Sequence, residues 1–399
     1  MKILIVSQYY YPEQFQINEI APELVRRGYS VTVLCGTPNY PKGDIFPGYE
    51  NNSKSDEFIN GVRVIRARQR PRGHNIKSLI LNYYSFVKEA NRLVLGLEED
   101  FDVVLGYQLS PVTSMFPAIK YAKRSKVPLI LYVLDIWPVS GQSHLPLKNG
   151  LIYKWLAKIS KKIYNSADRI LVTSRPFVDY LNRINRVPLS KIGYLPQHAD
   201  MTLLEQDLGK CADNVVNFMF AGNLGAGATL EVIIGAAGIL GKRTDYKVHF
   251  VGDGSQRTKL ETLVNSLGLS DNFIFHGNKS RAEMPGYYKM ADALLITLRG
   301  NNEVGNTMPG KLQMYMTTGK PIFGAINGAA KEVIEESRCG KCVNAGDMDG
   351  LAALMLDFIE NRSVYSECGE NARTYFRTHF TLDKCVSHLE NELSNLLKQ

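Results

Sequence analysis

Long apolar runs are missing from this sequence of 399 residues. The longest candidate, Leu129–Leu134, is ended by Asp135 and falls far short of the roughly 20 apolar residues that a membrane-spanning helix needs. The first residues, Met1–Ser7, lack the basic flank and the longer apolar stretch of a signal peptide. We therefore expect a cytoplasmic protein without a membrane-spanning segment.

Cysteine and histidine are also scarce, with six and seven residues. Six cysteines in a chain of this length do not make the disulfide framework of a small secreted domain. Cys339 and Cys342 have the CxxC spacing, but no second pair follows and no histidine is near in sequence. We therefore expect them in a strand and its turn rather than in a metal or redox site. The scattered histidines offer no Ser–His–Asp arrangement.

The composition is that of an ordinary globular protein, with 45% hydrophobic and 22% charged residues, which excludes disordered and collagen-like chains. The length suggests two or three domains. Charge is unevenly distributed: residues 1–200 carry 27 Lys+Arg against 16 Asp+Glu, a net charge of +11, and the remainder has a net charge of −3. The basic residues gather in Arg63–Arg72, Lys120–Lys126 and Lys148–Lys162. This asymmetry favours an anionic partner for the first half, with a merely solvated surface as the alternative.

The first half alternates buried apolar runs with amphipathic stretches. The predicted strands are Lys2–Val6, Ser30–Leu34, Val62–Ala67, Val103–Leu105, Leu129–Val133 and Arg169–Thr173. The predicted helices are Asn18–Arg27, 76–96, 111–125, 148–166 and 176–184. Such alternation is typical of a doubly wound α/β domain, which we place at residues 1–200.

The pattern breaks over Gln197–Asn214 and then restarts. The predicted strands of this second part are Val216–Ala221, Lys247–Val251, Asn272–His276, Ala293–Leu298 and Pro321–Ala325. Its predicted helices are Leu230–Leu240, Arg257–Leu267, Ala282–Lys289 and Gly310–Thr318. We expect a second α/β domain over 213–380 and a final helix within 381–399, which could pack on either domain. Ligands of such sheets bind at the carboxyl ends of the strands.

The strongest site signal is Gly305–Leu312, which opens a predicted helix. Pro309 suits a helix start, and Lys311 brings a positive charge into the first turn, where the helix dipole disfavours it unless an anion is present. A helix N-terminus and an ammonium group together predict a phosphate site. The spacing of a Walker motif is absent.

Weaker signals come from two glycine-rich turns and two acidic pairs. The turns Ala221–Gly227 and Gly252–Gly254 follow predicted strands and let a ligand approach the backbone. Asp347 and Asp349 resemble a metal-binding Asp-x-Asp motif, but they precede the apolar helix Leu351–Leu356 and are better explained as an N-cap. Glu98–Asp100 is expected to be solvated.

With these segments in hand, the chain resembles the retaining GT-B fold glycosyltransferases of family four (group 1), in the bacterial branch that builds O-antigens, capsules and other surface polysaccharides. The likeness covers nearly the whole chain and rests on several motifs in the same order. These motifs are Gln8–Glu13, Thr37–Gly43, Leu134–Pro138, Ala221–Gly225, Val251–Gly254 and Pro309–Pro321.

The resemblance implies two Rossmann-like domains, with the acceptor bound by the first and a nucleotide-sugar donor by the second. It implies transfer with retention, without a metal or other cofactor, and with the leaving phosphate oxygen taking the acceptor's proton. By the same resemblance, the catalytic group comprises Lys311, Arg299 and Asn306. The donor-binding group comprises Asn223, Gly225, Gly252, His276, Asn278, Glu303, Thr307 and Pro309. The acceptor-binding group comprises Glu13, Asn18, Tyr40, Asp135 and Trp137.

Two departures from the family pattern affect the donor. The family's two glutamates, spaced E-x7-E, correspond to Asn306 and Met314, and Glu303 lies three residues out of register. The glycine-rich loop of the first domain is also missing, since Gln14–Asn18 has no glycine. An amide at Asn306 both donates and accepts hydrogen bonds, so we predict an N-acetylated or deoxygenated donor sugar. The alternative is that Glu303 reaches the sugar and that Asn306 only caps the turn.

The leading hypothesis is therefore a nucleotide-sugar transferase acting on a polyprenyl-diphosphate-linked saccharide at the inner face of the cell membrane. Two amphipathic helices support an anionic membrane surface as a partner: Lys148–Asn165, with Trp155, Leu156, Ile159 and Ile163 among lysines, and 76–95, with Leu79, Leu81, Tyr84 and Phe86. A nucleotide-sugar epimerase of the same fold is one alternative. A basic nucleic-acid-binding protein is another, although the aromatic residues are not interleaved with the lysines.

Overall fold

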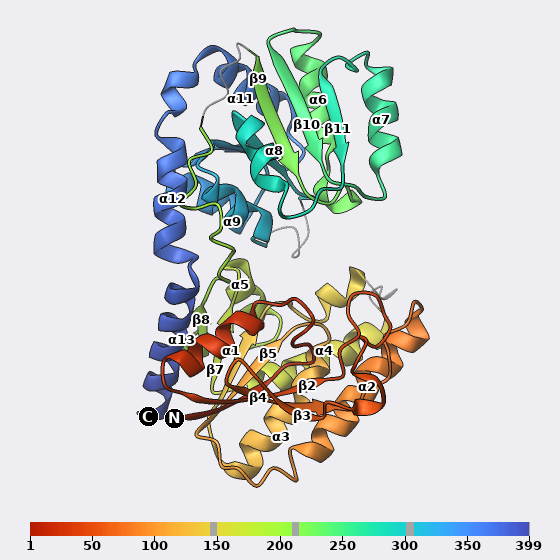
Figure 1. Ribbon diagram of the computed structural model, residues 1–399, viewed down its shortest axis with the longest axis vertical. Helices are drawn as coiled ribbons and strands as arrows, with labels where there is room; N and C mark the ends of the chain where they lie inside the picture. Colours follow the sequence, from red (N-terminus) through yellow and green to blue (C-terminus); the bar gives the residue numbers. More distant parts are fainter. Residues whose placement is uncertain (144–149, 210–214, 301–306, 399) are drawn as a thin grey trace. The chain divides into compact units, whose positions relative to one another are not determined.

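In a computed structural model of the chain, residues 1–143, 150–209, 215–300 and 307–398 are described. The chain forms two compact units (Figure 1). Unit 1 comprises Met1–His198 and Leu382–Gln399, and unit 2 comprises Ala199–Thr381. Both are α/β units whose helices cover the two faces of a central sheet, so the predicted fold class is confirmed.

The sheet of unit 1 has eight strands in the order β3-β4-β2-β1-β5-β6-β7-β8, all parallel except β3. The strands are β1 Lys2–Val6, β2 Ser30–Gly36, β3 Asp56–Ile59, β4 Val62–Ala67, β5 Val103–Gln108, β6 Leu129–Val133, β7 Arg169–Val172 and β8 Ile192–Tyr194. The helices are α1 Ile17–Arg26, α2 Ile76–Leu93, α3 Phe116–Ser125, α4 Leu151–Asn165, α5 Pro176–Arg183 and α13 Leu382–Leu397. The short strands β3 and β8 are additions to the predicted set.

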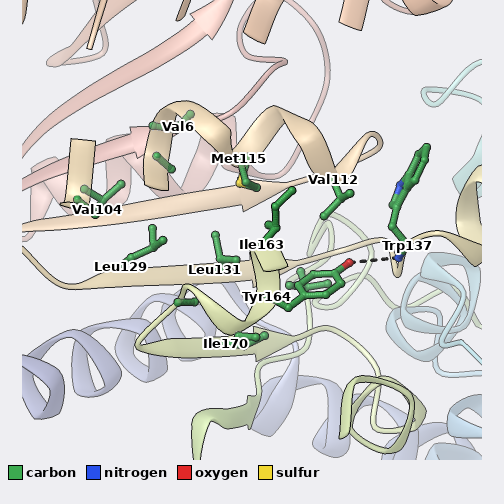
Figure 2. Packing of buried hydrophobic residues seen from close by; sticks show 14 of the residues in the cluster. Val6, Val104, Val112, Met115, Leu129, Leu131, Trp137, Ile163, Tyr164 and Ile170 are labelled. Carbon is green, nitrogen blue, oxygen red and sulfur yellow. Dashed lines mark hydrogen bonds between the residues drawn. The ribbon is translucent and has the colours of Figure 1, made fainter. Parts of the chain in front are cut away.

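Two apolar cores lie on opposite faces of this sheet. One is formed with α2, α3 and α4, and Figure 2 shows part of it, with Met115 and Ile163 facing the strand residues Val104, Leu131 and Ile170. The other is formed with α1 and α13. Because parallel strands buried on both faces need apolar residues at nearly every position, the continuous runs in the sequence predicted them correctly.

The last helix, α13, lies beside α1 in unit 1 (Figure 1). Cys385, Val386, Leu389 and Leu393 bury their side chains in the core there. Arg27 pairs with Asp383 and Glu390 of this helix, and Arg169 pairs with Glu392 through two hydrogen bonds of 2.8 Å. Apolar burial and these ion pairs together explain why the helix packs on unit 1.

The sheet of unit 2 has six parallel strands in the order β11-β10-β9-β12-β13-β14. The strands are β9 Val216–Ala221, β10 Tyr246–Val251, β11 Phe273–Gly277, β12 Ala293–Thr297, β13 Ile322–Ala325 and β14 Gly340–Val343. The helices are α6 Glu231–Leu240, α7 Arg257–Ser266, α8 Met284–Met290, α9 Gly310–Thr317, α10 Ala329–Ser337, α11 Met348–Glu360 and α12 Cys368–His379. The strand order reverses direction between β9 and β12, where doubly wound sheets bind ligands at the strand ends.

Two smaller predictions in unit 2 can be checked directly. Asp347 caps α11, and its carboxylate accepts a hydrogen bond of 2.8 Å from the Gly350 N–H, as expected of an N-cap. Cys342 lies in β14 and Cys339 directly precedes that strand, and both are free thiols. Both positions therefore serve local structure.

Some of the apolar residues predicted to face a membrane are buried instead, so that prediction was wrong for part of both helices. Leu79 and Phe86 of α2, and Leu156 and Ile163 of α4, are buried in the core of unit 1. The exposed apolar residues of these helices are Ile76, Ile80, Tyr84, Leu151, Ile152 and Trp155. Both helices are apolar on more than one side near their N-termini, so periodicity alone did not identify the outer face. None of the described helices combines the length and apolar character required to cross a membrane.

Candidate functional site

Three glycines end neighbouring strands of unit 2 at the same edge of the sheet. Gly222 follows β9, Gly252 follows β10 and Gly277 ends β11, and all three have positive φ angles of 145°, 135° and 71°. The Gly222 N–H donates to the Val251 carbonyl and the Gly252 N–H to the Gly277 carbonyl, at 2.8 and 2.9 Å. A Cβ on Gly252 would overlap the Gly222 carbonyl. The close approach of backbones therefore requires glycine here.

A cavity of about 290 Å³ opens above these strand ends. Its lining residues come from the ends of β9, β10 and β11 and from α8, and they are Ala221, Gly222, Asn223, Val251, Gly252, Asp253, Asn278, Lys279, Met284 and Tyr288. Three of the predicted donor-binding residues, Asn223, Gly252 and Asn278, are therefore brought together. Ligands of doubly wound sheets occupy this position.

Lys311 reaches this glycine edge from the first turn of α9. Its Nζ lies 3.3 Å from the centre of the Phe220 ring, and a Cβ on Gly222 would be 2.8 Å from it. Within the described residues no hydrogen bond or ion pair to Nζ is found. Burial lowers the pKa of Lys311 to about 7, because desolvation disfavours the charged ammonium. A partly buried ammonium without a counter-ion among the described residues is suited to an anion.

The start of α9 has no side-chain cap from the described residues. Its N-cap residue is Pro309. The first N–H groups of a helix have no partner within it and carry the positive end of the helix dipole. Together with Lys311, this helix start has the composition of a diphosphate site.

Tyr315 fixes α9 to the end of β9, a contact that the sequence analysis missed. Its hydroxyl accepts from the Ala221 N–H at 2.7 Å and donates to the Ala221 carbonyl at 3.2 Å. The side chain is fully buried. Since Tyr315 lies one turn after Lys311, it holds that lysine next to Gly222.

The loop after β9 carries further predicted residues. A Cβ on Gly225 would lie 3.4 Å from the Asn223 side-chain amide, and a Cβ on Gly254 would overlap the Asn223 side-chain oxygen. Arg299, which is exposed, donates from its backbone N–H to the Gly227 carbonyl at 3.0 Å and from Nη2 to the Ala226 carbonyl at 3.4 Å. The predicted second cation thus lies on the glycine-rich loop.

His276 has a different environment from the one predicted. Its Nε2 lies 2.9 Å from Nδ1 of His249, and the two rings are stacked. Nε2 of His249 lies 3.0 Å from the Asn217 side-chain oxygen, which can only accept a hydrogen bond. Nε2 of His249 therefore carries the proton, and Nδ1 of His249 accepts a hydrogen bond from His276. Burial lowers the pKa of His249 to about 4 and that of His276 as well. The imidazole of His276 is therefore stacked on His249, and His276 is not among the residues that line the cavity.

The remaining donor predictions lie in or beside a segment outside the described residues. Glu303 and Asn306 belong to residues 301–306, so both assignments stay predictions. Thr307 and Pro309 are partly buried at the start of α9. Met314, at the position of the family's second glutamate, packs against the apolar core of unit 2.

In unit 1, Glu13 joins two loops at the carboxyl edge of the sheet. Its buried carboxylate accepts backbone N–H bonds from Asn39 at 2.8 Å, Tyr40 at 2.7 Å and Tyr10 at 3.2 Å. Burial raises the pKa of Glu13 to about 7, in spite of these bonds. Its oxygens are thus engaged within the protein, so the structure gives it the role of holding the loops after β1 and β2.

The side chains of the other loop residues remain partly accessible. Asn18 donates to the Glu13 carbonyl at 2.5 Å. Tyr40 packs with Tyr9 and Phe15, with ring centres 5.3 to 5.5 Å apart across the cluster. The guanidinium of Arg72 lies 5.4 Å from the Tyr40 ring centre and donates to the Tyr9 hydroxyl. The three rings lie on the loops after β1 and β2, where the acceptor was predicted.

Asp135 and Trp137 follow β6 and belong to one hydrogen-bond network. The Asp135 carboxylate accepts from the backbone N–H and the hydroxyl of Ser110, at 3.1 and 2.8 Å, and Nε1 of Trp137 donates to the same hydroxyl at 3.0 Å. The Trp137 backbone N–H donates to the Tyr164 hydroxyl (Figure 2). Trp137 is buried, whereas Asp135 is partly exposed and stays a candidate for acceptor contact.

Comparison with known proteins gives a consistent result for both units. Residues 14–197 match the glycosyl transferase 4-like domain and residues 212–375 match the glycosyl transferases group 1 family. The chain is 25% identical over 200 residues, half of each protein, to the N-acetyl-alpha-D-glucosaminyl L-malate synthase of Bacillus anthracis. It is 22% identical over 98% of its length and 97% of the relative to the GDP-mannose-dependent alpha-mannosyltransferase of Mycolicibacterium smegmatis.

Two solved structures share the fold over nearly their whole chains. HepE of Anabaena, determined in complex with UDP, is 15% identical and covers 99% of this chain and 100% of its own, with a TM-score of 0.70. The lipopolysaccharide outer core galactosyltransferase WaaB is also 15% identical, with 99% of each chain covered and a TM-score of 0.70. At this identity the likeness concerns the two-domain fold.

Proposed function

The chain is a glycosyltransferase of the GT-B type, and we propose that it transfers a sugar from a nucleoside diphosphate donor held by unit 2 to a saccharide held by unit 1. The observation that carries the proposal is the position of Lys311, a partly buried ammonium beside the Gly222 backbone at the edge of a strand-end cavity, with no ion pair to any described residue. HepE, which shares the fold, was determined in complex with UDP, and this supports a nucleotide donor.

The chemistry proposed for unit 2 is electrostatic. When the bond between the anomeric carbon and the β-phosphate oxygen breaks, negative charge grows on the diphosphate. Lys311 and the first N–H groups of α9 stabilise that charge more in the transition state than in the bound donor. The acceptor oxygen forms the new bond on the same face of the sugar, and its proton passes to the departing phosphate oxygen. This route gives retention, and with Lys311 in the cation's place we propose that no divalent metal is needed.

For the donor sugar we propose an N-acetylated or deoxygenated hexose. The amide of Asn306 and the apolar Met314 replace the two glutamates expected by family resemblance. The relative named for an N-acetyl-glucosaminyl product supports this choice, whereas the GDP-mannose-dependent relative supports a competing donor. A panel of UDP- and GDP-sugars therefore separates the two.

For the acceptor we propose a lipid-linked saccharide of a bacterial surface polysaccharide, reached at the cytoplasmic face of the membrane. Structures and relatives with roles in lipopolysaccharide and colanic acid synthesis support this setting. Exposed apolar residues at the starts of α2 and α4, next to Lys154, Lys158 and Lys161, support binding to an anionic membrane.

The experiment that tests the function is a transfer assay with the purified chain, a donor panel and lipid-linked acceptors, read by mass spectrometry, with the anomeric configuration read by NMR. We expect Lys311→Ala to lower kcat/KM by about a hundredfold or more, since one charge stabiliser of the transition state is lost. EDTA should leave the rate unchanged. Near wild-type activity of Lys311→Ala would contradict the donor site, and conversion of the donor to its epimer without an acceptor would favour an epimerase instead.

A further inference from the structure

Four arginines occupy alternate positions from the end of β4 onward, and two of them have no hydrogen-bond or ion-pair partner among the described residues. Arg66 is buried and pairs with Glu57, and Arg72 donates to the Tyr9 hydroxyl. Arg68 and Arg70 are exposed, and no hydrogen bond or ion pair of either guanidinium is found in the described part of the chain. Glu89, which influences Arg68 electrostatically, is hydrogen-bonded to Arg92. This run is part of the basic stretch Arg63–Arg72, which favours an anionic partner.

The backbone that carries Arg68 and Arg70 is fixed by buried side chains. Asn82, fully buried on α2, donates to the Arg70 carbonyl at 2.6 Å, and the Arg70 N–H donates to the Ser85 hydroxyl at 2.9 Å. The neighbouring Gln69, also buried, donates to the Thr37 carbonyl at 2.7 Å. Because this backbone is already held in place, binding of a ligand by its arginines costs less conformational entropy.

The two arginines line a cavity of about 420 Å³ in unit 1, here called the arginine pocket. Its other polar lining residues include Asn51, Asn52, Gln69 and Ser85, from the turn before β3, the segment after β4 and α2. No carboxylate lines it among the described residues. The volume lies within the range of small-ligand sites.

The composition of the arginine pocket matches a charged saccharide. A guanidinium group binds a planar carboxylate or a phosphate through paired hydrogen bonds. Amide and hydroxyl side chains donate to and accept from sugar hydroxyls. The segment then continues to Arg72, whose N–H donates to the Asn39 side chain at 3.0 Å, and the N–H groups of Asn39 and Tyr40 are bound by Glu13. The segment that lines the pocket is therefore bonded to the loops predicted to hold the acceptor.

We propose that the arginine pocket binds an anionic group of the acceptor, a carboxylate or a phosphate that stands next to sugar hydroxyls. This inference rests on the proposed function for the identity of the ligand as acceptor. The binding chemistry is the same for an acidic sugar of the saccharide and for the phosphate of a lipid carrier.

The test is a binding titration of the full chain with its donor site saturated by UDP, so that anions cannot bind there. Three probes are compared by calorimetry: methyl glucuronide, inorganic pyrophosphate and the neutral methyl glucoside. We expect at least one anionic probe to bind at least tenfold more tightly than the glucoside. Preference for the glucuronide identifies an acidic sugar as the source, and preference for pyrophosphate identifies a lipid-carrier phosphate.

The variants attribute that binding to the pocket. The double variant Arg68→Ala/Arg70→Ala should weaken binding of the anionic probe at least tenfold. Arg70→Lys should also weaken this binding, although it keeps the positive charge. The double variant Lys77→Ala/Lys88→Ala removes two exposed charges from α2 and should change nothing. Equal binding of the glucoside, or unchanged binding by the arginine variants, would overturn the inference. UDP affinity measured on each variant reports folding, and a wild-type chain that fails to bind UDP would contradict the proposed function instead.

Discussion

Lys311 couples the donor site to pH at the scale of a single residue. Burial lowers its pKa to about 7, so the ammonium is partly neutral near neutral pH in the unliganded protein. Anionic oxygens near Nζ favour the charged form and raise this pKa. Donor binding above pH 7 therefore takes up a proton, whereas below pH 7 the group is already charged.

We predict that UDP affinity falls between pH 7 and pH 9, approaching tenfold per pH unit at the upper end. Calorimetry at pH 8.5 in buffers of different ionisation enthalpy should show uptake of close to one proton per UDP. Lys311→Met should bind more weakly and without proton uptake. A wild-type titration at pH 8.5 with no buffer dependence would show that Lys311 does not meet the diphosphate.

The lowered pKa of Lys311 affects stability in the opposite direction: the free energy of unfolding rises with pH, whereas UDP affinity falls. Between pH 7 and the ordinary lysine pKa of 10.5, the unfolded chain holds more protons at this position than the folded chain, so the Lys311 contribution becomes less unfavourable as pH rises. Below pH 7 the buried charge costs the fold its full penalty, on the order of a few kcal/mol. Donor binding relieves that penalty, which is a reason for the lysine to lie there.

Tyr315 acts on the site through its backbone contacts, as a positioning residue. Tyr315→Phe leaves the Ala221 N–H and carbonyl without their buried partner, which should cost about 1–3 kcal/mol of stability. We further predict a UDP affinity lowered about tenfold, because α9 and Lys311 are no longer held against β9. Thermal unfolding and UDP titration measure the two effects.

Tyr246→Phe is the matched control for that prediction. The Tyr246 hydroxyl bonds to the Ala237 and Gly241 carbonyls, each at 3.2 Å, at the opposite end of its strand from the cavity. This variant should lose comparable stability and keep its UDP affinity. If both variants lose UDP affinity to the same extent, the effect of Tyr315 is general destabilisation rather than positioning.

At the scale of elements, the strand-end glycines make a specific prediction. Gly252→Ala places a methyl group into the Gly222 carbonyl at a φ of 135°, so either β9 or β10 must move. We expect loss of measurable UDP binding together with lower stability. Gly286→Ala on α8, where an added Cβ meets no atom within 4 Å, should bind UDP normally and be no less stable. Normal UDP binding by Gly252→Ala would place the nucleotide elsewhere.

The sequence predicts elements well where one physical cause dominates. Continuous apolar runs marked the buried parallel strands. Gly252 marked a turn whose positive φ few other residues adopt, and Pro309 marked the start of α9. The edge strand β3 was missed because its four residues, Asp56–Ile59, are two acidic residues followed by two apolar ones, which is neither a continuous apolar run nor an alternation. Tyr315 was missed because its partner Ala221 lies 94 residues away, a separation that no local pattern reports.

The predicted site residues divide in the same way. Lys311, Asn223 and Asn278 lie at strand or helix ends, positions that topology brings to one edge of the sheet. His276 also ends a strand, but its side-chain direction depends on His249 and Asn217 in the neighbouring strands. Glu13 faces inward because three backbone N–H groups need an acceptor, a demand visible only once the loops are folded.

At the scale of the whole molecule, the excess positive charge belongs to the same unit as the exposed apolar residues. Residues 1–200 have a net charge of +11. The helices α2 and α4 cover one face of the sheet of unit 1, and both begin at its carboxyl edge because they follow β4 and β6. Leu151, Ile152 and Trp155 are 85%, 65% and 61% exposed, which is unusual for large apolar side chains unless a partner covers them.

We predict that the chain binds vesicles containing about 30% anionic lipid, and that Ile152→Ala/Trp155→Ala weakens this binding at least tenfold. Each buried large apolar side chain contributes about 1.5–3 kcal/mol, and each lysine near the surface about 1 kcal/mol. Because the lysine contribution is screened, raising the salt concentration should weaken binding further. The control is Phe58→Ala, which removes an apolar side chain 74% exposed on the edge strand β3 and should leave binding unchanged. Vesicle sedimentation measures the binding of each variant. Binding that does not weaken with salt, or that Phe58→Ala lowers as much as the α4 variant does, would indicate nonspecific hydrophobic adsorption rather than binding through α4.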